Sequence, residues 1–141
     1  MFEIDCVEVT RWRSALTAAL ESSSGLDDAD RIDAIRALEE LVCVATAAQA
    51  ALAVELDVSQ QAAQRSAGVP DARRGCGVAA QVALARRESP HRGQRHLGLA
   101  RIVASELPHA WSAWRAGLIT EWKAMLIARE TGCLSSEDRA A

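Results

Sequence analysis

The segment Ile35–Leu56, with the sequence IRALEELVCVATAAQAALAVEL, repeats its apolar residues with the period of an α-helix. One row recurs at spacings of three and four residues and consists of Ile35, Leu38, Val42, Ala45, Gln49, Leu52 and Leu56. A second row lies one residue away and consists of Ala34, Ala37, Leu41, Val44, Ala48 and Ala51. Together the rows predict a long helix with a wide apolar face, whose small side chains favour close approach of a partner helix.

The boundaries of this helix can also be predicted. A serine run followed by Gly25 interrupts any helix before it, and Asp28 and Asp30 place negative charge where a helix N-terminus carries partial positive charge. Gly68 and Pro70 end the apolar pattern. We therefore expect one helix over about 28–66.

The rest of the chain divides into shorter helical segments. Val78–Arg87 is rich in alanine, and Ser89 followed by Pro90 favours a new helix, because serine caps it and proline suits its first position. The residues expected in the core of that helix are Leu97, Ala100, Val103, Ala104 and Leu107. No run alternates with a period of two over the length of a strand. The pattern predicts an all-α, irregular helical bundle without a sheet, folded as a single domain over residues 1–141.

The four tryptophans are expected in the core, because each can bury about 150–250 Å² in a chain that otherwise has 29 alanines. Trp12 lies on an early amphipathic segment. Trp111 and Trp114 are three residues apart and share one helix face. Thr120 caps the next helix, which is expected to turn Trp122 inward.

The sequence offers no framework for catalysis or for a metal site. It has no G-x-S-x-G element and no glycine-rich phosphate loop, so we expect no enzyme activity and no small-molecule substrate. The cysteines are far apart, at Cys6, Cys43, Cys76 and Cys133. His91 and His96 lack paired cysteines and are interpreted as solvated surface, so no metal and no cofactor are expected.

The location of the protein is predicted from its first residues and its hydropathy. Acidic residues occupy the positions where a secretory leader needs basic and apolar ones, which favours the cytoplasm. There the four thiols are expected to stay reduced and to pack as small apolar groups. The longest stretch without charge, 41–54, is too short to span a bilayer, so no membrane is expected.

Charge is distributed unevenly along the chain. Residues 1–64 carry 4 arginines and 12 acids, whereas residues 65–141 carry 11 arginines and one lysine against 7 acids. The candidate nucleic-acid contacts are Arg73, Arg74, Arg86, Arg87, Arg92 and Arg95. Guanidinium groups pair well with phosphates, so one hypothesis is a free-standing DNA-binding module that uses the basic segment Arg65–Arg101, which has 8 arginines against Asp71 and Glu88. The alternative is that the acidic and basic halves neutralise each other inside the fold.

Two further hypotheses concern helices. The apolar face of the long helix can meet a second copy or another helical partner, which would make the chain an interaction module. The helices around Gly117 also resemble a helix-turn-helix, although Lys123 occupies a position where that motif needs an apolar residue.

Five stretches together resemble one protein family. They are GVAAQVALARR (77–87), SPHRG (89–93), LGLAR (97–101), ELPH (106–109) and RAGLITEWK (115–123). The chain is similar over about residues 30–141 to the actinobacterial 13E12-repeat proteins, whose N-terminal region is the domain of unknown function 222. The resemblance implies a helical region that commonly precedes a C-terminal HNH nuclease domain, which binds a divalent metal and cuts DNA.

The nuclease part of that family is not expected in this chain. An HNH site needs histidines around a central asparagine, and the sequence contains no asparagine. The resemblance therefore implies a non-catalytic, HNH-associated helical domain, whose role is not established for the family, and it carries over no catalytic residue. Our hypothesis is that this domain at most assists DNA contact or self-association. The run Ser135–Asp138 is typical of a helix start only three residues before Ala141, which predicts a domain shortened at its C-terminus; a polar tail is the alternative.

Overall fold

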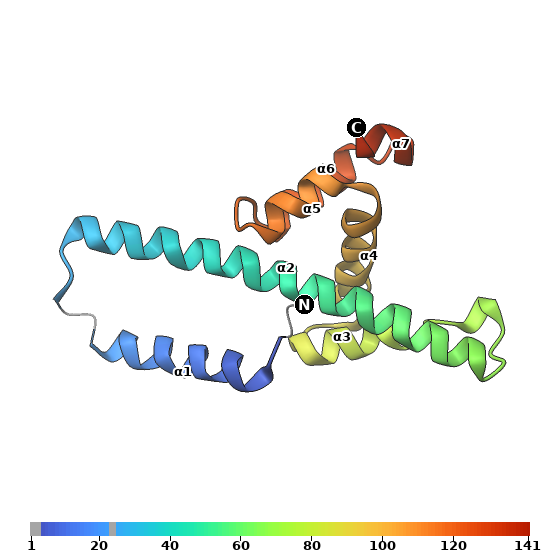
Figure 1. The fold of residues 1–141 in the computed structure, drawn as a ribbon, viewed down its shortest axis with the longest axis horizontal. Helices are drawn as coiled ribbons and strands as arrows, with labels where there is room; N and C mark the ends of the chain where they lie inside the picture. The colour runs from blue at the N-terminus through green and yellow to red at the C-terminus, as the bar shows by residue number, and fades with distance from the viewer. Residues whose placement is uncertain (1–3, 23–24) are drawn as a thin grey trace. The chain divides into compact units, whose positions relative to one another are not determined.

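The computed structural model describes residues 4–22 and 25–141, and this part of the chain is all-α, without a strand (Figure 1). Its elements are α1 (Cys6–Glu21), α2 (Asp28–Ser66), the single-turn helix η2 (Asp71–Arg73), α3 (Val78–Arg86), α4 (Pro90–Glu106), α5 (Pro108–Arg115), α6 (Glu121–Glu130) and α7 (Ser136–Ala140). The predicted all-α bundle with one long helix is confirmed, and α2 has the expected bounds.

The contacts within the chain form two compact units, one up to Ala37 and one over Leu38–Ala141, and the division falls inside α2. In the first unit, the Asp5 side chain caps α1 by accepting a hydrogen bond from the Val7 backbone at 2.9 Å. No residue of α1 is buried, and Trp12 is 53% exposed. The expected core position of Trp12 is therefore wrong.

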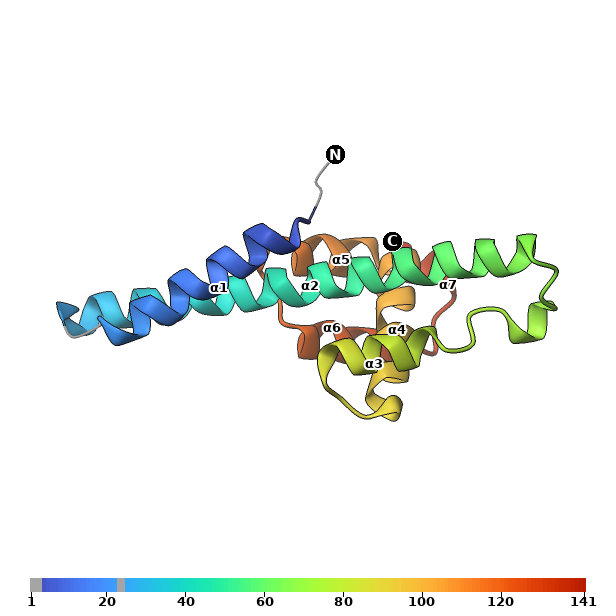
Figure 2. The ribbon, with the colours of Figure 1, turned by 90° about the horizontal axis from the view of Figure 1, so that it is seen from below.

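The core of the second unit is built around a row of small side chains on α2. The buried residues of α2 are Cys43, Ala47, Ala50, Ala53 and Asp57. In both views of the ribbon, α4 runs across the C-terminal half of α2 (Figures 1 and 2). Val103, Leu107 and Trp114 pack in the same cluster as Ala47 and Ala50. Small residues on α2 thus leave room for large residues from α4 and α5.

This buried row corrects the two rows predicted from the sequence. Leu38, Val42 and Leu52 of the first row are exposed, as are Leu41 and Val44 of the second. The period identified the helix correctly, but the side that faces the core is set by the shape of the partner helices. The core residues predicted for α4 are confirmed, apart from the half-buried Ala104.

Two polar contacts fix the packing of α2 in this unit. The Trp114 side chain is fully buried, and its indole Nε1 donates to Thr46 Oγ1 at 3.0 Å. Asp57 is buried, and its two carboxylate oxygens accept hydrogen bonds from Arg101 at 2.7 and 2.8 Å. The Arg101 guanidinium holds the pKa of the Asp57 carboxyl below its usual range.

The helix ends follow the local signals in the sequence. Ser89 caps α4 by accepting from the Arg92 backbone, with Pro90 at the first helical position, and Thr120 caps α6 by accepting from the Lys123 backbone. Gly117 has a φ of +79°, which glycine adopts without strain, and it closes the turn after α5. Ser135 caps α7, so the helix start expected there is present.

Candidate nucleic-acid interface

The structure separates the six predicted arginines into two groups by their partners. Arg74 donates its Nε to the Val69 carbonyl at 2.8 Å and pairs with Asp71. Arg86 is half-buried and meets both carboxylate oxygens of Glu121 at 3.2 and 3.3 Å. These two guanidinium groups therefore hold the fold together. Arg73, Arg87, Arg92 and Arg95 are exposed.

The exposed arginines do not form a single cluster. Arg73 ends η2, in the segment 67–77 that follows the C-terminal end of α2 and lies away from the turn between α3 and α4 (Figure 2). Arg87, Arg92 and Arg95 flank that turn and the first turns of α4. We name these three residues the arginine corner. The segment 86–96 around it carries four arginines and one glutamate, which gives it a balance of +3.

The local sequence explains how this corner is shaped. Arg87 ends α3 in the left-handed conformation, with a φ of 57° and a ψ of 43°, and the Glu88 backbone donates to the Ala83 carbonyl at 2.9 Å. This tight turn leads directly into α4. Arg92 and Arg95 are three residues apart and so share a face of α4 near its N-terminus, where the helix dipole adds partial positive charge.

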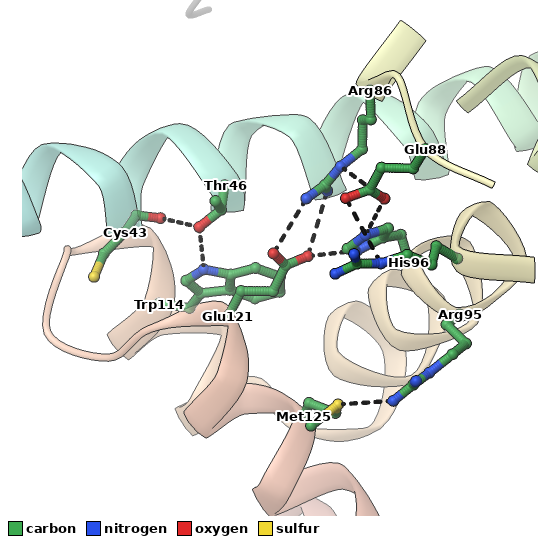
Figure 3. Close-up of polar contacts among 10 residues, drawn as sticks. Cys43, Thr46, Arg86, Glu88, Arg95, His96, Trp114, Glu121 and Met125 are labelled. Atoms are coloured by element: carbon green, nitrogen blue, oxygen red, sulfur yellow. Dashed lines mark hydrogen bonds and ion pairs between the residues drawn. The ribbon is translucent and has the colours of Figure 1, made fainter. Parts of the chain in front are cut away.

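Beside the corner lies a compact network of charged side chains that connects the end of α3, α4 and the start of α6 (Figure 3). His96 lies between two carboxylates, with Nδ1 at 2.7 Å from Glu121 Oε1 and Nε2 at 2.6 Å from Glu88 Oε2. Glu88 Oε2 is buried and accepts no hydrogen bond. Its approach to His96 Nε2 is therefore a close contact between the two groups and not a hydrogen bond. Arg86 joins the network through Glu121.

The network joins α3, α4 and α6 through charged side chains. A general base needs a nitrogen or oxygen that faces a substrate, and both nitrogens of His96 face carboxylates of the chain itself. The sequence interpretation of His96 as solvated surface is therefore wrong, whereas His91 is exposed as expected. This cluster could not be predicted from the sequence, because Glu88, His96 and Glu121 are far apart along the chain. The one local signal is Glu121, an acid directly after the Thr120 cap, which is typical of a helix start.

A cavity of about 330 Å³ lies between α4 and α6, next to this network. From α4 it is lined by Arg92, Arg95, His96 and Leu99. From α6 it is lined by Glu121, Trp122 and Met125. The Trp122 side chain is 61% exposed, so the prediction that it points inward is wrong. The small residues Ala124 and Ala128 face the core from α6 instead.

The acidic residues of α2 do not neutralise the corner. Within Leu38–Ala141, all of which the structure describes, the ion pair of Asp57 with Arg101 is the one that joins a residue before 65 to a residue after it. Arg87 and Arg95 have no ion pair in this unit, and Arg92 has a single contact, at 3.9 Å from Glu88. Within this unit, the acids before residue 65 pair with Arg101 and not with the corner. The alternative that the acidic and basic halves neutralise each other stays a prediction.

The cysteines differ from the expectation that all four pack as small apolar groups. Cys43 is buried, and burial raises the pKa of its thiol, but Cys6, Cys76 and Cys133 are exposed. All four thiols are free. Within residues 4–22 and 25–141, no three or more histidine, cysteine or acidic side chains are grouped so that they could hold a metal ion.

The long helix also has a membrane-like composition. By length and composition alone, α2 is apolar enough to cross a bilayer, with a mean hydropathy of 1.7 over an 18-residue window. Core helices of soluble proteins share this property, and one row of α2 is buried against α4 and α5. The expectation that no membrane is involved stays a prediction.

Comparisons with known proteins add no relative to this description. No family model, no curated protein and no solved structure matches the chain. The candidate interface consists of three exposed arginines around the turn between α3 and α4, two of which, Arg92 and Arg95, line the cavity between α4 and α6.

Proposed function

We propose that this chain is a non-catalytic helical domain of the 13E12-repeat, HNH-associated type, which works in the cytoplasm and contacts DNA through the arginine corner. The observation that carries the proposal is the state of Arg87, Arg92 and Arg95, which are exposed and free of close ion pairs in the Leu38–Ala141 unit. Guanidinium groups in this state release counterions when they meet phosphates, which favours binding. The proposal includes no metal, no cofactor and no small-molecule substrate.

The non-catalytic part of the proposal has its own support. Both nitrogens of the His96 ring lie within 2.7 Å of carboxylates of the chain itself, which supports a role for His96 in positioning the helices. The chain also lacks the asparagine that an HNH centre requires. Metal-dependent cleavage of plasmid DNA by the purified chain would overturn this part.

Salt dependence of DNA binding tests the contact itself. If the corner neutralises three phosphates, the logarithm of the affinity for duplex DNA falls with the logarithm of salt at a slope of about −2.7. Arg92→Gln and Arg95→Gln each reduce the magnitude of that slope by about 0.9 and weaken binding alike for all sequences. Filter binding with a labelled duplex at several salt concentrations measures both effects.

Arg73→Gln is the matched control, because Arg73 is an exposed arginine of the predicted set that lies outside the corner. We expect it to leave the slope unchanged. Absence of binding at low salt, or an equal loss of slope in the Arg73 variant, contradicts the assignment of the contact to the corner.

Self-association through α2 is a second candidate function, and it is supported by a different observation. From Leu38 onward α2 belongs to the second unit, and there it exposes the large apolar side chains of Leu38, Leu41, Val42, Val44 and Leu52. Contiguous exposed apolar side chains are typical of surfaces that meet a partner, here a second copy of the chain. A concentration-dependent mass in sedimentation velocity supports this candidate.

A further inference from the structure

The cavity between α4 and α6 combines a cationic rim with an aromatic platform. Arg92 and Arg95 supply two exposed guanidinium groups on the side of α4. Trp122 supplies a large indole that is 61% exposed on the side of α6. An aromatic side chain with most of its surface in water, next to free cations, is an arrangement that a stacked base and its phosphate would satisfy.

Part of the cavity lining is apolar. Leu99 and Met125 are half-buried and line the cavity, and Arg95 Nη2 donates to Met125 Sδ at 3.4 Å. This contact places the Arg95 side chain along the cavity wall (Figure 3). A flat, uncharged ring can therefore contact apolar atoms and the indole together, while a guanidinium stays available for an anion.

The one carboxylate in the lining does not cancel the cationic rim. Glu121 already meets Arg86 through both carboxylate oxygens and His96 through Oε1. Its charge is thus compensated by Arg86, which does not line the cavity, whereas Arg92 has only a contact of 3.9 Å with Glu88 and Arg95 has no ion pair in this unit.

From this chemistry we infer that the cavity holds an unpaired nucleotide of single-stranded DNA, with its base stacked on Trp122 and its phosphate beside Arg92 and Arg95. The inference rests on the proposed DNA contact and adds the form of DNA that is preferred. In a duplex both faces of each base are covered by neighbouring bases, whereas a single strand can turn a base face toward the indole. The volume of about 330 Å³ is near the lower end of ligand-sized pockets and suits one base.

The test compares a labelled 12-residue oligothymidylate with a duplex of the same length, by filter binding at low salt. Trp122→Ala removes the stacking platform, which contributes about 1–3 kcal/mol per base, so we expect oligothymidylate to bind about 5- to 150-fold more weakly. Duplex binding should stay within about twofold, because the arginines remain. Trp122→Phe keeps an aromatic face and should restore most of the affinity.

Trp12→Ala is the control, since Trp12 is similarly exposed, at 53%, but lies on α1. Its oligothymidylate binding should equal that of the unaltered chain. Helical content from circular dichroism confirms that each variant is folded. If Trp122→Ala weakens both DNA forms equally, or neither, the stacking site is excluded while the DNA contact stands. If the unaltered chain binds neither form, the proposed function fails as well.

Discussion

Gly93 sets how closely α3 and α4 approach each other. A Cβ atom added at this position would lie 2.3 Å from the Ala79 carbonyl oxygen and 2.5 Å from the Ala83 Cβ, both on α3. Neither atom belongs to a flexible side chain, so the helices would have to move apart. The position of the arginine corner thus depends on the absence of a side chain one residue beyond Arg92.

We predict that Gly93→Ala lowers the free energy of unfolding by about 1–3 kcal/mol, the usual cost of overpacking a core contact. Urea unfolding followed by circular dichroism measures the change. Gly98→Ala is the control on the same helix, because nothing lies within 4 Å of its added Cβ. There the gain in helix propensity should raise stability by about 0.5–1 kcal/mol. If both variants raised the free energy of unfolding, the close contact of Gly93 with α3 would not limit which residue can occupy position 93.

At the scale of the element, capping signals were predictable and side-chain direction was not. Ser89 and Thr120 were identified as caps because capping depends on a few neighbouring residues. The direction of Trp122 depends on which residues of α6 fit against the rest of the unit, and Ala124 and Ala128 fill that role. For α2 the same reason applies, since its buried row is the one that accommodates Trp114 and its neighbours.

The exposed side of α2 leads to a prediction about this element. If two copies associate through it, Leu41→Glu should weaken the dimer by about 10- to 100-fold, since a buried leucine contributes about 1.5–3 kcal/mol. Sedimentation velocity over a range of concentrations measures the effect. Leu84→Glu is the control, because Leu84 is 81% exposed on α3. An unaltered chain that stays monomeric at all concentrations removes self-association as a function.

At the scale of the whole molecule, the uneven charge of the sequence predicted a cationic surface but not its extent. The counts of basic and acidic residues located it between Arg65 and Arg101. Which guanidinium groups remain free depends on partners that are distant in the chain, such as Glu121 for Arg86 and Asp57 for Arg101. No local pattern encodes those pairs. The expected single domain over residues 1–141 stays a prediction, since contacts form two units.

The pH dependence of stability is a further whole-molecule prediction. The pKa of Asp57 is lowered in the folded state by Arg101, so the pair stabilises the fold above the unfolded pKa of about 3.9 and loses this contribution as pH falls below it. The pKa of Cys43 is raised by burial, so stability should also decline above about pH 8.5, where the unfolded thiol ionises first. Urea unfolding over a pH series measures both limbs.

Asp57→Asn isolates the acidic limb of that profile. We expect the unaltered chain to be more stable than this variant near neutral pH, by about 1.5–3 kcal/mol, because a hydrogen bond to a charged group is lost. The difference should shrink steadily as pH falls through the acidic range. A difference that stays constant between pH 6 and pH 3 would show that ionisation of Asp57 does not contribute.

The Trp114 indole is fully buried, and its Nε1 donates to Thr46 Oγ1. This burial has a consequence for the fluorescence of the chain. Trp12 and Trp122 already lie largely in water, so their emission changes little when the chain unfolds. Trp114 is shielded from water in the native state, and its light shifts to longer wavelength once α5 separates from α2. Trp111 also packs against Trp114, so the emission of these two residues of α5 together reports whether α5 and α2 remain packed.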